Sequence, residues 1–416
     1  MSAAATTSAA PRRSQLWLIC AADFLVWLGS GAVYPYLPVF LREQMGASLR
    51  VLGLAASAYF IGVLVFSVPA GQLSDRMGRK PMIVAGMALY ALSTALFLST
   101  RDPWLFVLFR ALEGLGTALV VPAAQAFVAD ITTEEHRSRA YGWLATAQYG
   151  GLILGPAIAW PFYALGGAGT RYSYYGIFLF GALAAAVATI VLAVLLREPA
   201  RTDSPRERVR PPLRTLVTRP IAAVIVVTAT AEFAMGGFEV VWSIYLRHLG
   251  ASITVVGLTW ILFGAPMLLS FLGGRLADRR NKVALMIAGF AVQGVCWLLV
   301  PAVNDPSVFL LVLPLDGLAF ALALPAKQGF LVQISPERWL GSIQGTEQAA
   351  MQLAALVGTL TAPWLYGRYE GGFFAFAGVV ALAGLVLASP TLLRTWRSVD
   401  SRAGGEDDAG RRSVPG

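Results

Sequence analysis

The sequence is poor in charge, in cysteine and in histidine, and each shortage excludes a class of protein. Only 13% of its 416 residues are charged, whereas 57% are hydrophobic, and the mean hydropathy is +0.65. A soluble protein of this length needs more charge on its surface, so a soluble globular fold is excluded. Cys20 and Cys296 each fall inside an apolar run and form no disulfide or metal-ligand pattern.

Catalytic side chains are equally scarce. The two histidines, His136 and His248, lie in a charged loop and at the edge of an apolar run. The phosphate-binding motif G-x-x-x-x-G-K-[ST] does not occur, which argues against ATP-driven transport by this chain. We therefore expect no enzymatic activity, no metal ion and no cofactor.

Long apolar runs are what the sequence has in abundance. Runs without a charged residue that are long enough to cross about 30 Å of hydrocarbon as helices are 51–74, 81–100, 140–170, 172–196, 248–274, 283–304, 348–367 and 371–393. Four further apolar runs, interrupted by one or two charges, are 15–41, 103–129, 220–246 and 306–333. Because the runs are continuous instead of alternating, they predict helices and not a barrel. The sequence thus predicts an all-α integral membrane protein with twelve transmembrane helices.

Basic residues are distributed unevenly between the two sets of loops. With the N-terminus inside, the cytoplasmic segments hold 24 lysines and arginines and the outer loops hold 6. This asymmetry predicts that both termini are cytoplasmic. The net charge of +9 is then a signal of topology, and we expect no nucleic-acid partner.

The chain contains an internal repeat. The segment "GQLSDRMGRK" from Gly71 returns as "GRLADRRNK" from Gly274, an offset of 203 residues. A stretch rich in arginine and proline separates six spans from six similar ones, as in secondary transporters built from repeats. The predicted units are an N-terminal cytoplasmic tail (1–14), a six-helix half (15–196), a cytoplasmic linker (197–219), a second six-helix half (220–396) and a C-terminal cytoplasmic tail (397–416).

The loop between the second and third spans resembles the signature of the major facilitator superfamily. Its pattern G-x-L-x-D-R-x-G-R-K is filled by Gly71, Leu73, Asp75, Arg76, Gly78, Arg79 and Lys80. The run 103–129 carries "RALEGLG", similar to the family's R-x-x-Q-G-x-G, and the run 140–170 carries "GGLILGPAIAW", similar to a motif of the drug:proton antiporters. The resemblance implies two pseudo-symmetric halves around a central cavity. It also implies gating roles for Gly71, Asp75, Arg76, Gly78, Arg79, Gly274, Asp278, Arg279, Gly155 and Pro156. For the charged residues among them the alternative is that they only keep the loop soluble.

The four runs interrupted by charge are the first of each group of three spans, and in the resembling family these helices line the cavity. A carboxylate at membrane depth costs at least about 2.5 to 3.5 kcal/mol, so such residues are functional candidates. Desolvation favours the neutral form of a carboxyl group, which suits a proton carrier. The candidates for proton coupling, the first three in order of preference, are Glu232, Asp316 and Asp23, followed by Glu113 with Arg110.

Other residues of these runs are candidates for the substrate cavity. Glu232, Met235, Gly236 and Glu239 are spaced as one stripe of a helix, and Asp23, Trp27, Ser30 and Tyr34 form another. The residues assigned to the cavity are Trp27, Tyr34, Met235, Glu239, Phe320 and Lys327. Four structural alternatives stay open. Arg110 and Glu113 can be a mere ion pair, and Lys327 can reach towards the cytoplasmic interface or pair with Glu347. Glu239 can be a rim residue in outer water, and the aromatic rings can be packing residues.

Together these features predict a proton-coupled secondary transporter in the inner membrane of a bacterium. The excess of acids over bases in the cavity spans favours efflux of lipophilic or cationic small molecules, as in multidrug antiport by alternating access. The alternatives are export of a sugar or other metabolite, uptake by symport, lipid flipping and, outside transport, a ligand-binding membrane sensor. The expected partners are protons, a small-molecule substrate and the lipid bilayer, with the protein as a monomer.

Overall fold

The computed structural model describes residues 9–167, 169–199, 216–336 and 339–412. Within these ranges the chain folds into helices that follow one another along it, with short π- and 3₁₀-helical segments between some of them. Eight of the helices are each long and apolar enough to cross a membrane. The expected all-α membrane fold is therefore confirmed. Most of the predicted linker 197–219 and of the predicted tail 1–14 lies outside the described residues. The predicted tail 397–416 is described up to Arg412, and to that point it belongs to the last helix.

The elements from α1 to α7 form what we call the N half. Its elements are α1 (Ala9–Val33), α2 (Leu37–Val39), the π-helical η1 (Phe40–Gln44), α3 (Leu49–Met77), α4 (Arg79–Leu96), α5 (Pro103–Ile131), α6 (Glu134–Leu165) and α7 (Arg171–Leu195). The elements from α9 to α15 form what we call the C half. Its elements are α9 (Arg219–His248), α10 (Ile253–Gly264), η2 (Ala265–Leu269), α11 (Ser270–Arg279), α12 (Lys282–Leu299), η3 (Val300–Ala302), η4 (Pro306–Val308), α13 (Phe309–Ile334), α14 (Leu340–Arg368) and α15 (Gly372–Arg412).

Local chemistry explains where several helices begin and end. The side chains of Ser48, Asp102 and Asn281 accept backbone N–H groups in the first turns of α3, α5 and α12. Gly78, with φ of +109°, ends α3 in a conformation that other residues rarely adopt. The expected span 248–274 is broken, because the chain tightens into the 3₁₀ segment η2 around Pro266 before α11 begins.

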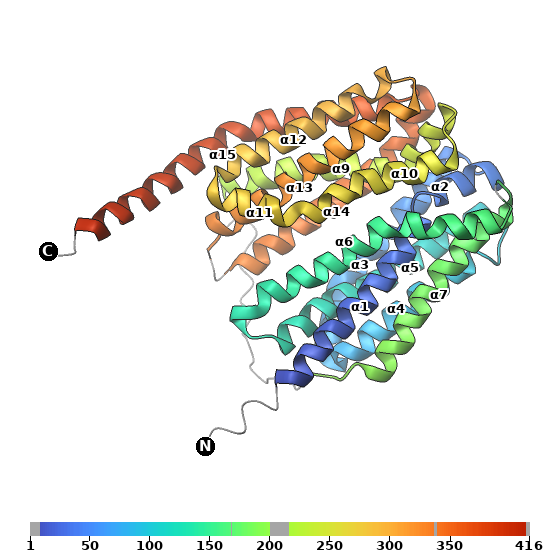
Figure 1. Cartoon of the computed structure of the whole chain (residues 1–416), viewed down its shortest axis with the longest axis horizontal. Coiled ribbons are helices and arrows are strands. Elements are labelled where there is room, and N and C mark those ends of the chain that lie inside the picture. Colours follow the sequence, from blue (N-terminus) through green and yellow to red (C-terminus); the bar gives the residue numbers. More distant parts are fainter. Residues whose placement is uncertain (1–8, 168, 200–215, 337–338, 413–416) are drawn as a thin grey trace.

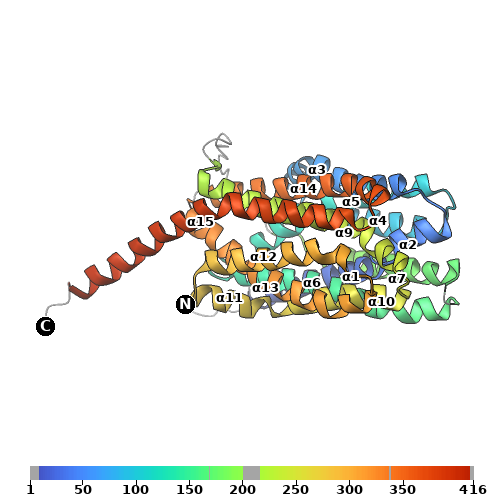
Figure 2. The ribbon, with the colours of Figure 1, turned by 90° about the horizontal axis from the view of Figure 1, so that it is seen from above.

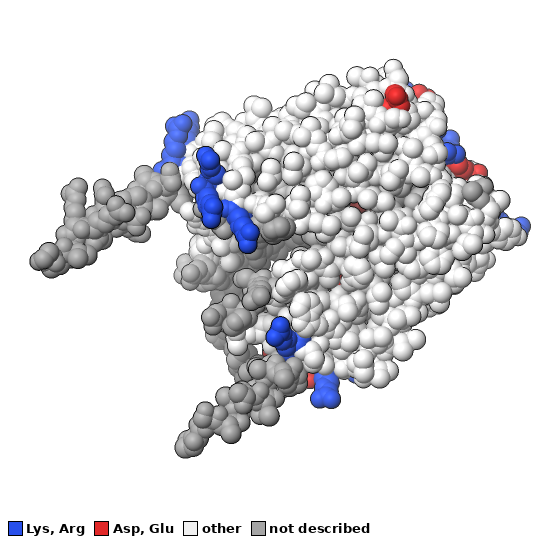
Figure 3. All heavy atoms as spheres, viewed as in Figure 1, with Lys and Arg blue, Asp and Glu red and all other residues white. Residues whose placement is uncertain are grey.

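The two halves repeat the same packing. In the N half Gly86 of α4 lies against Gly116 of α5, and in the C half Gly289 of α12 lies against Ala319 of α13. Both positions are related by the offset of 203 residues found in the sequence. Figure 1 shows the halves as two bundles whose helices run between a common pair of ends. Charged side chains gather at these ends, and the band between them is almost free of charge, as a lipid-facing belt requires (Figure 3).

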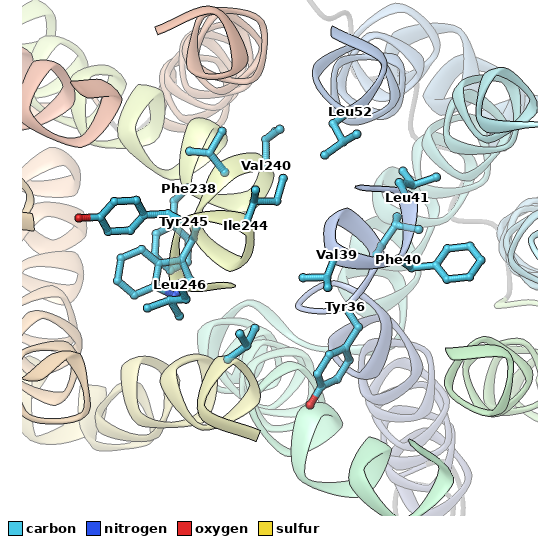
Figure 4. Close-up of a cluster of buried hydrophobic side chains, with 14 of the residues drawn as sticks. Tyr36, Val39, Phe40, Leu41, Leu52, Phe238, Val240, Ile244, Tyr245 and Leu246 are labelled. Carbon is cyan, nitrogen blue, oxygen red and sulfur yellow. The ribbon is translucent and has the colours of Figure 1, made fainter. Parts of the chain in front are cut away.

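The halves meet at the end of the bundle that lies away from both chain termini, which we call the distal end (Figures 1 and 2). There α3 packs on α14, α6 packs on α10, and α2 packs on α9. The apolar core extends across this junction, with Val39, Leu41 and Leu52 opposite Val240 and Ile244 (Figure 4). The distal end is therefore closed by hydrophobic contact between the halves.

Candidate functional site

The predicted stripe on α9 faces a space between the halves. Glu232, Met235 and Glu239 are each partly exposed, whereas Phe233 and Phe238 beside them are buried in the C half. Gly236, the fourth residue of the stripe, lies at its edge against the backbone of Ala355 in α14, where any larger residue would collide. Packing against α14 thus turns the two carboxyl groups away from the core of the C half.

Arg110 and Glu113 form a closed ion pair on α5. Arg110 Nη1 donates to Glu113 Oε2 at 2.7 Å, and Thr94 Oγ1 of α4 donates to Glu113 Oε1 at 2.7 Å. The guanidinium carbon lies 4.6 Å from the ring centre of Tyr59 and 5.6 Å from that of Tyr34. The pair is buried, so its charges are compensated inside the N half. This geometry fits the ion-pair alternative, and a role in coupling stays a prediction.

Asp23 lies in a cavity inside the N half. The residue is 5% exposed, and its Oδ2 has no hydrogen-bond partner among the described residues. The walls are polar and aromatic, with Ser30 and Tyr90 joined by a hydrogen bond of 2.6 Å. Residues that line this cavity include Trp27, Tyr34, Tyr59 and Thr117. The predicted stripe of Asp23, Trp27 and Tyr34 is therefore brought together around one space.

Asp316 lies in a second, apolar cavity inside the C half. It is 3% exposed, and its Oδ1 has no hydrogen-bond partner in the described part of the chain. The walls include Phe238, Trp242 and Trp297. Asp316 stands 203 residues after Glu113, and Trp297 stands 203 residues after Thr94, so the carboxyl groups are repeat equivalents. Unlike Glu113, Asp316 has no arginine three residues before it.

Two residues predicted for the substrate cavity make other contacts. Phe320 is buried among Phe263 and Phe290, each with a ring-centre distance of 6.4 Å, so it lies in the core of the C half. Lys327 Nζ donates to Glu347 Oε1 of α14 at 2.8 Å, and the side chains are only 7% and 5% exposed. The pairing with Glu347 was one of the alternatives from the sequence.

The residues predicted for gating near the chain termini form a charge cluster within the N half. Arg79 contacts Asp75 at 2.6 Å and Asp130 at 3.1 Å. The carboxylate of Glu198 accepts the backbone N–H groups of Arg79 and Lys80 at 2.6 and 2.8 Å. Arg76 is exposed in the last turn of α3. The cluster therefore ties α3, α4 and α5 to the segment that follows α7.

Two of the glycines predicted for gating lie near a proline, and their gating role stays a prediction. Gly71 lies near Pro122, and its repeat equivalent Gly274 lies near Pro325. Arg279 of the repeated motif is exposed, and the side chain of Asp278 lies outside the described residues.

Gly155 and Pro156 place α6 against α1. Gly155 lies against the backbone of Gly31 and Ala32, and the carbonyl oxygen of Pro156 accepts from the Tyr36 hydroxyl at 3.5 Å. Their gating role stays a prediction.

Comparison with known proteins decides the family. The model of the Major Facilitator Superfamily matches residues 19–258 and 224–412. This chain belongs to the major facilitator superfamily. It is therefore a multi-pass membrane protein and a secondary transporter of small molecules, not an enzyme.

Its curated relatives include drug-resistance proteins. The chain is 24% identical over 383 residues to the quinolone resistance protein NorA of Staphylococcus aureus, covering 90% of this chain and 95% of that protein. It is 27% identical over 384 residues to multidrug resistance protein 2 of Bacillus subtilis, covering 88% and 92%. The resemblance to multidrug efflux proteins is thus confirmed as a distant relationship.

Solved structures share the fold. A bacterial homologue of the lysosomal transporter Spinster, in an inward-facing and occupied conformation, gives a TM-score of 0.73 at 15% identity over 93% of this chain and 97% of that one. The human organic anion transporter MFSD10 gives 0.65 at 20% identity over 91% and 99%. At these identities the likeness shows the fold alone.

Sequence reasoning missed the contacts that join the halves of the transporter. Arg247 at the end of α9 pairs with Glu43 of η1 at 2.7 Å. Ser57 Oγ of α3 and Thr359 Oγ1 of α14 form a buried hydrogen bond of 2.7 Å. The partners are 204 and 302 residues apart, so no local pattern in one sequence could have paired them.

Proposed function

We propose that this transporter is a proton-coupled exporter of lipophilic or cationic small molecules that works by alternating access. The observation that carries the proposal is the acidic stripe of α9, which presents Glu232 and Glu239 to the space between the halves. Tyr34 of the N half lines a cavity together with Glu239, where an apolar cation would compete with Arg110 for the face of the aromatic ring. The names of the drug-resistance relatives support efflux.

Glu232 is the proposed proton carrier. Among the described residues it has no ion pair and no hydrogen bond, because Lys327, the nearby cation, is held by Glu347. A partly buried carboxyl group without a partner exchanges its charge more easily than one fixed in an ion pair. Asp316 and Asp23, also with an unpartnered carboxyl oxygen each, are the next candidates. Glu113 is ranked below them because Arg110 and Thr94 occupy its oxygens.

The proposed orientation puts both termini in the cytoplasm of a bacterium, as the excess of basic residues favours. The closed distal end then faces outward, and the conformation is inward-facing. Asp75 and Arg76 are proposed to act in the opposite conformation, when the ends of the two halves near the termini approach each other. The transporter is proposed to be a monomer.

The test is transport by purified protein in liposomes under an imposed pH gradient, with tetraphenylphosphonium as the cationic probe. We expect Glu232→Gln to abolish uphill transport while binding of the probe in detergent is retained. Asp316→Asn tests the second carboxyl group, and Asp75→Asn serves as a comparison outside the cavity. Wild-type protein that moves only anions, or that moves the probe without proton flux, would contradict the proposal. Unchanged gradient-driven transport by Glu232→Gln would move the proton site elsewhere.

A further inference from the structure

The cavity around Asp23 contains one buried polar atom that the protein itself does not satisfy. The hydroxyl groups in its walls pair with one another: Ser30 and Tyr90 share a hydrogen bond of 2.6 Å. The Tyr59 hydroxyl donates to Thr117 Oγ1 at 3.4 Å. Oδ2 of Asp23 is the one buried side-chain atom of this lining without a hydrogen-bond partner in the described part of the chain. The cavity therefore offers a single free acceptor to a ligand that can donate to it.

The internal repeat shows that this hollow is not a general feature of the fold. Met87 and Thr117 line the cavity, and the residues 203 positions later, in α12 and α13, are Phe290 and Phe320. The centres of these two rings lie 6.4 Å apart, and both residues are buried in the core of the C half. The C half is thus filled with aromatic rings where the N half is left open.

The repeat also aligns the two helices that carry the predicted stripes. Gly155 lies against the backbone nitrogen of Ala32, and its repeat equivalent Gly358 lies against the backbone nitrogen of Gly237. Residues of α1 therefore correspond to residues of α9 that stand 205 positions later. By this alignment the stripe of α1 is the counterpart of the stripe of α9, which faces the space between the halves. The cavity beside the α1 stripe is then reached from that space.

The counterpart of Asp23 on α9 is Thr228, which needs no ligand. Thr228 is 2% exposed, and its hydroxyl donates to the carbonyl oxygen of Val224 at 3.1 Å, so its own helix satisfies it. Asp23 places a carboxyl group at the same position, and no helix backbone N–H is free to receive it there. Relative to its repeat, the N half has gained both an acid and a hollow next to it.

We propose that this cavity is the head-group site for a protonated organic amine, whose ammonium group donates to Oδ2 of Asp23. The rings of Trp27, Tyr59 and Tyr90 line the same cavity and offer their faces to an organic cation. A sodium ion would lack ligands, because Ser30 lies seven residues, about 10 Å, along α1 from Asp23 and is already bonded to Tyr90. The cavity is too small for a bulky cation such as tetraphenylphosphonium, so that probe would stay in the space between the halves.

Binding of the amine should release a proton. A buried carboxyl group without a counter-ion favours its neutral form, and an ammonium ion beside it favours the ionised form. Neutral Asp23 therefore gives its proton to water as the amine is bound, and one positive charge replaces another. Protons compete with the amine for the same oxygen, so the apparent affinity for the amine falls as the pH falls.

The other titratable groups around Asp23 do not supply this proton. Those beside the cavity are Cys20, Tyr34, Tyr59, Tyr90 and, beyond Tyr90, the ion pair of Arg110 with Glu113. The thiol and the phenols stay neutral at physiological pH, and the ion pair is closed. Helix α6 faces Asp23 with Gln148, which does not titrate, and the titratable residues of α7 all lie within its first five positions. The role of the amine as cargo rests on the proposed function, whereas its binding does not.

The experiment is calorimetric titration of the full-length protein in detergent with 2-phenylethylamine at pH 6 and pH 8. Titration in two buffers with different heats of ionisation counts the protons released. We expect wild type to bind the amine with release of a proton and to bind 2-phenylethanol, the neutral analogue, at least about tenfold more weakly. Asp23→Asn should lose at least about tenfold in affinity for the amine and should release no proton. Asp102→Asn is the matched control, because it removes an exposed carboxyl group of the same half and asparagine still caps α5.

A second variant fills the cavity and keeps the carboxyl group. Thr117→Phe copies the residue found at the equivalent position of the C half, Phe320, and should also weaken amine binding at least about tenfold. Thermal unfolding in detergent shows whether this variant is folded, and Met87→Phe, the copy of Phe290, replaces it if it is not.

Three results would overturn the proposal: unchanged amine affinity in Asp23→Asn, equal binding of 2-phenylethanol, or displacement of the amine by sodium ions at constant ionic strength. The site and the proposed function fail separately. Amine binding with proton release but without proton-coupled export would refute the proposed function alone. Proton-coupled export of tetraphenylphosphonium by a protein that does not bind the amine would overturn this site alone.

Discussion

Glu43 and Arg247 join the two halves at the distal end by a two-pronged ion pair. Arg247 Nε lies 2.7 Å from Glu43 Oε1, and Nη2 lies 3.3 Å from Oε2. Nη1 of the same guanidinium donates to the carbonyl oxygen of Ala251 at 2.7 Å, which fixes its orientation. The side chains are 33% and 34% exposed, so water screens the pair and limits its contribution to about 1 kcal/mol.

Reversing one charge of this pair should shift the equilibrium between the distal-closed and distal-open conformations, and reversing both charges should restore it. Glu43→Arg or Arg247→Glu alone places like charges together and should raise the distal-open population up to about fivefold, as about 1 kcal/mol allows. The double reversal should return the population towards wild type. The distance between spin labels at Ser99 and Asn304, both exposed at the distal end, measures this at pH 8 once both cysteines have been replaced by serine. A double variant as open as the single ones would contradict a direct pairing.

Lys327 and Glu347 allow a test of a buried pair in the C half. Lys327→Met or Glu347→Gln alone leaves the other group buried without its partner, so each should lower the free energy of unfolding, by about 3–5 kcal/mol where a full charge is left. Lys327→Met with Glu347→Leu removes both charges and should recover most of the loss. Thermal unfolding in detergent measures the effect. Additive losses in the double variant would show that the two residues do not act as a pair.

Glu198 should hold the beginning of α4 through its two backbone contacts. Glu198→Ala leaves the N–H groups of Arg79 and Lys80 without their acceptor, which costs about 1 kcal/mol at a helix N-terminus. We expect amide exchange in the first turn of α4 to become about fivefold faster, with no change in α12 of the other half. Glu198→Asp, which keeps the charge, is the control. Equal protection in Glu198→Ala would show that water replaces the carboxylate without cost.

The parts of the site that were predictable depend on short-range periodicity. The stripe of Glu232, Met235 and Glu239 follows from the helical repeat, and the neighbouring residues of α9 then bury the other faces. Phe320 was less predictable, because aromatic residues serve equally in packing and in cavities. The break of the span 248–274 at η2 follows from Pro266 and not from any charged residue, so the absence of charge in that run did not indicate it.

By itself the sequence determined the membrane class, the expectation of twelve helices, the repeat and the family, because these depend on hydropathy, on charge counts and on motifs that are local in the chain. Only the tertiary structure decided which carboxyl groups are compensated. Glu113 meets Arg110 and Thr94, and Glu347 meets Lys327. Among the described residues Glu232 makes no ion pair, and Asp316 keeps one carboxyl oxygen, Oδ1, without a partner. Whether a buried charge has a partner of opposite charge depends on which helices pack against it, and that packing is a property of the whole bundle.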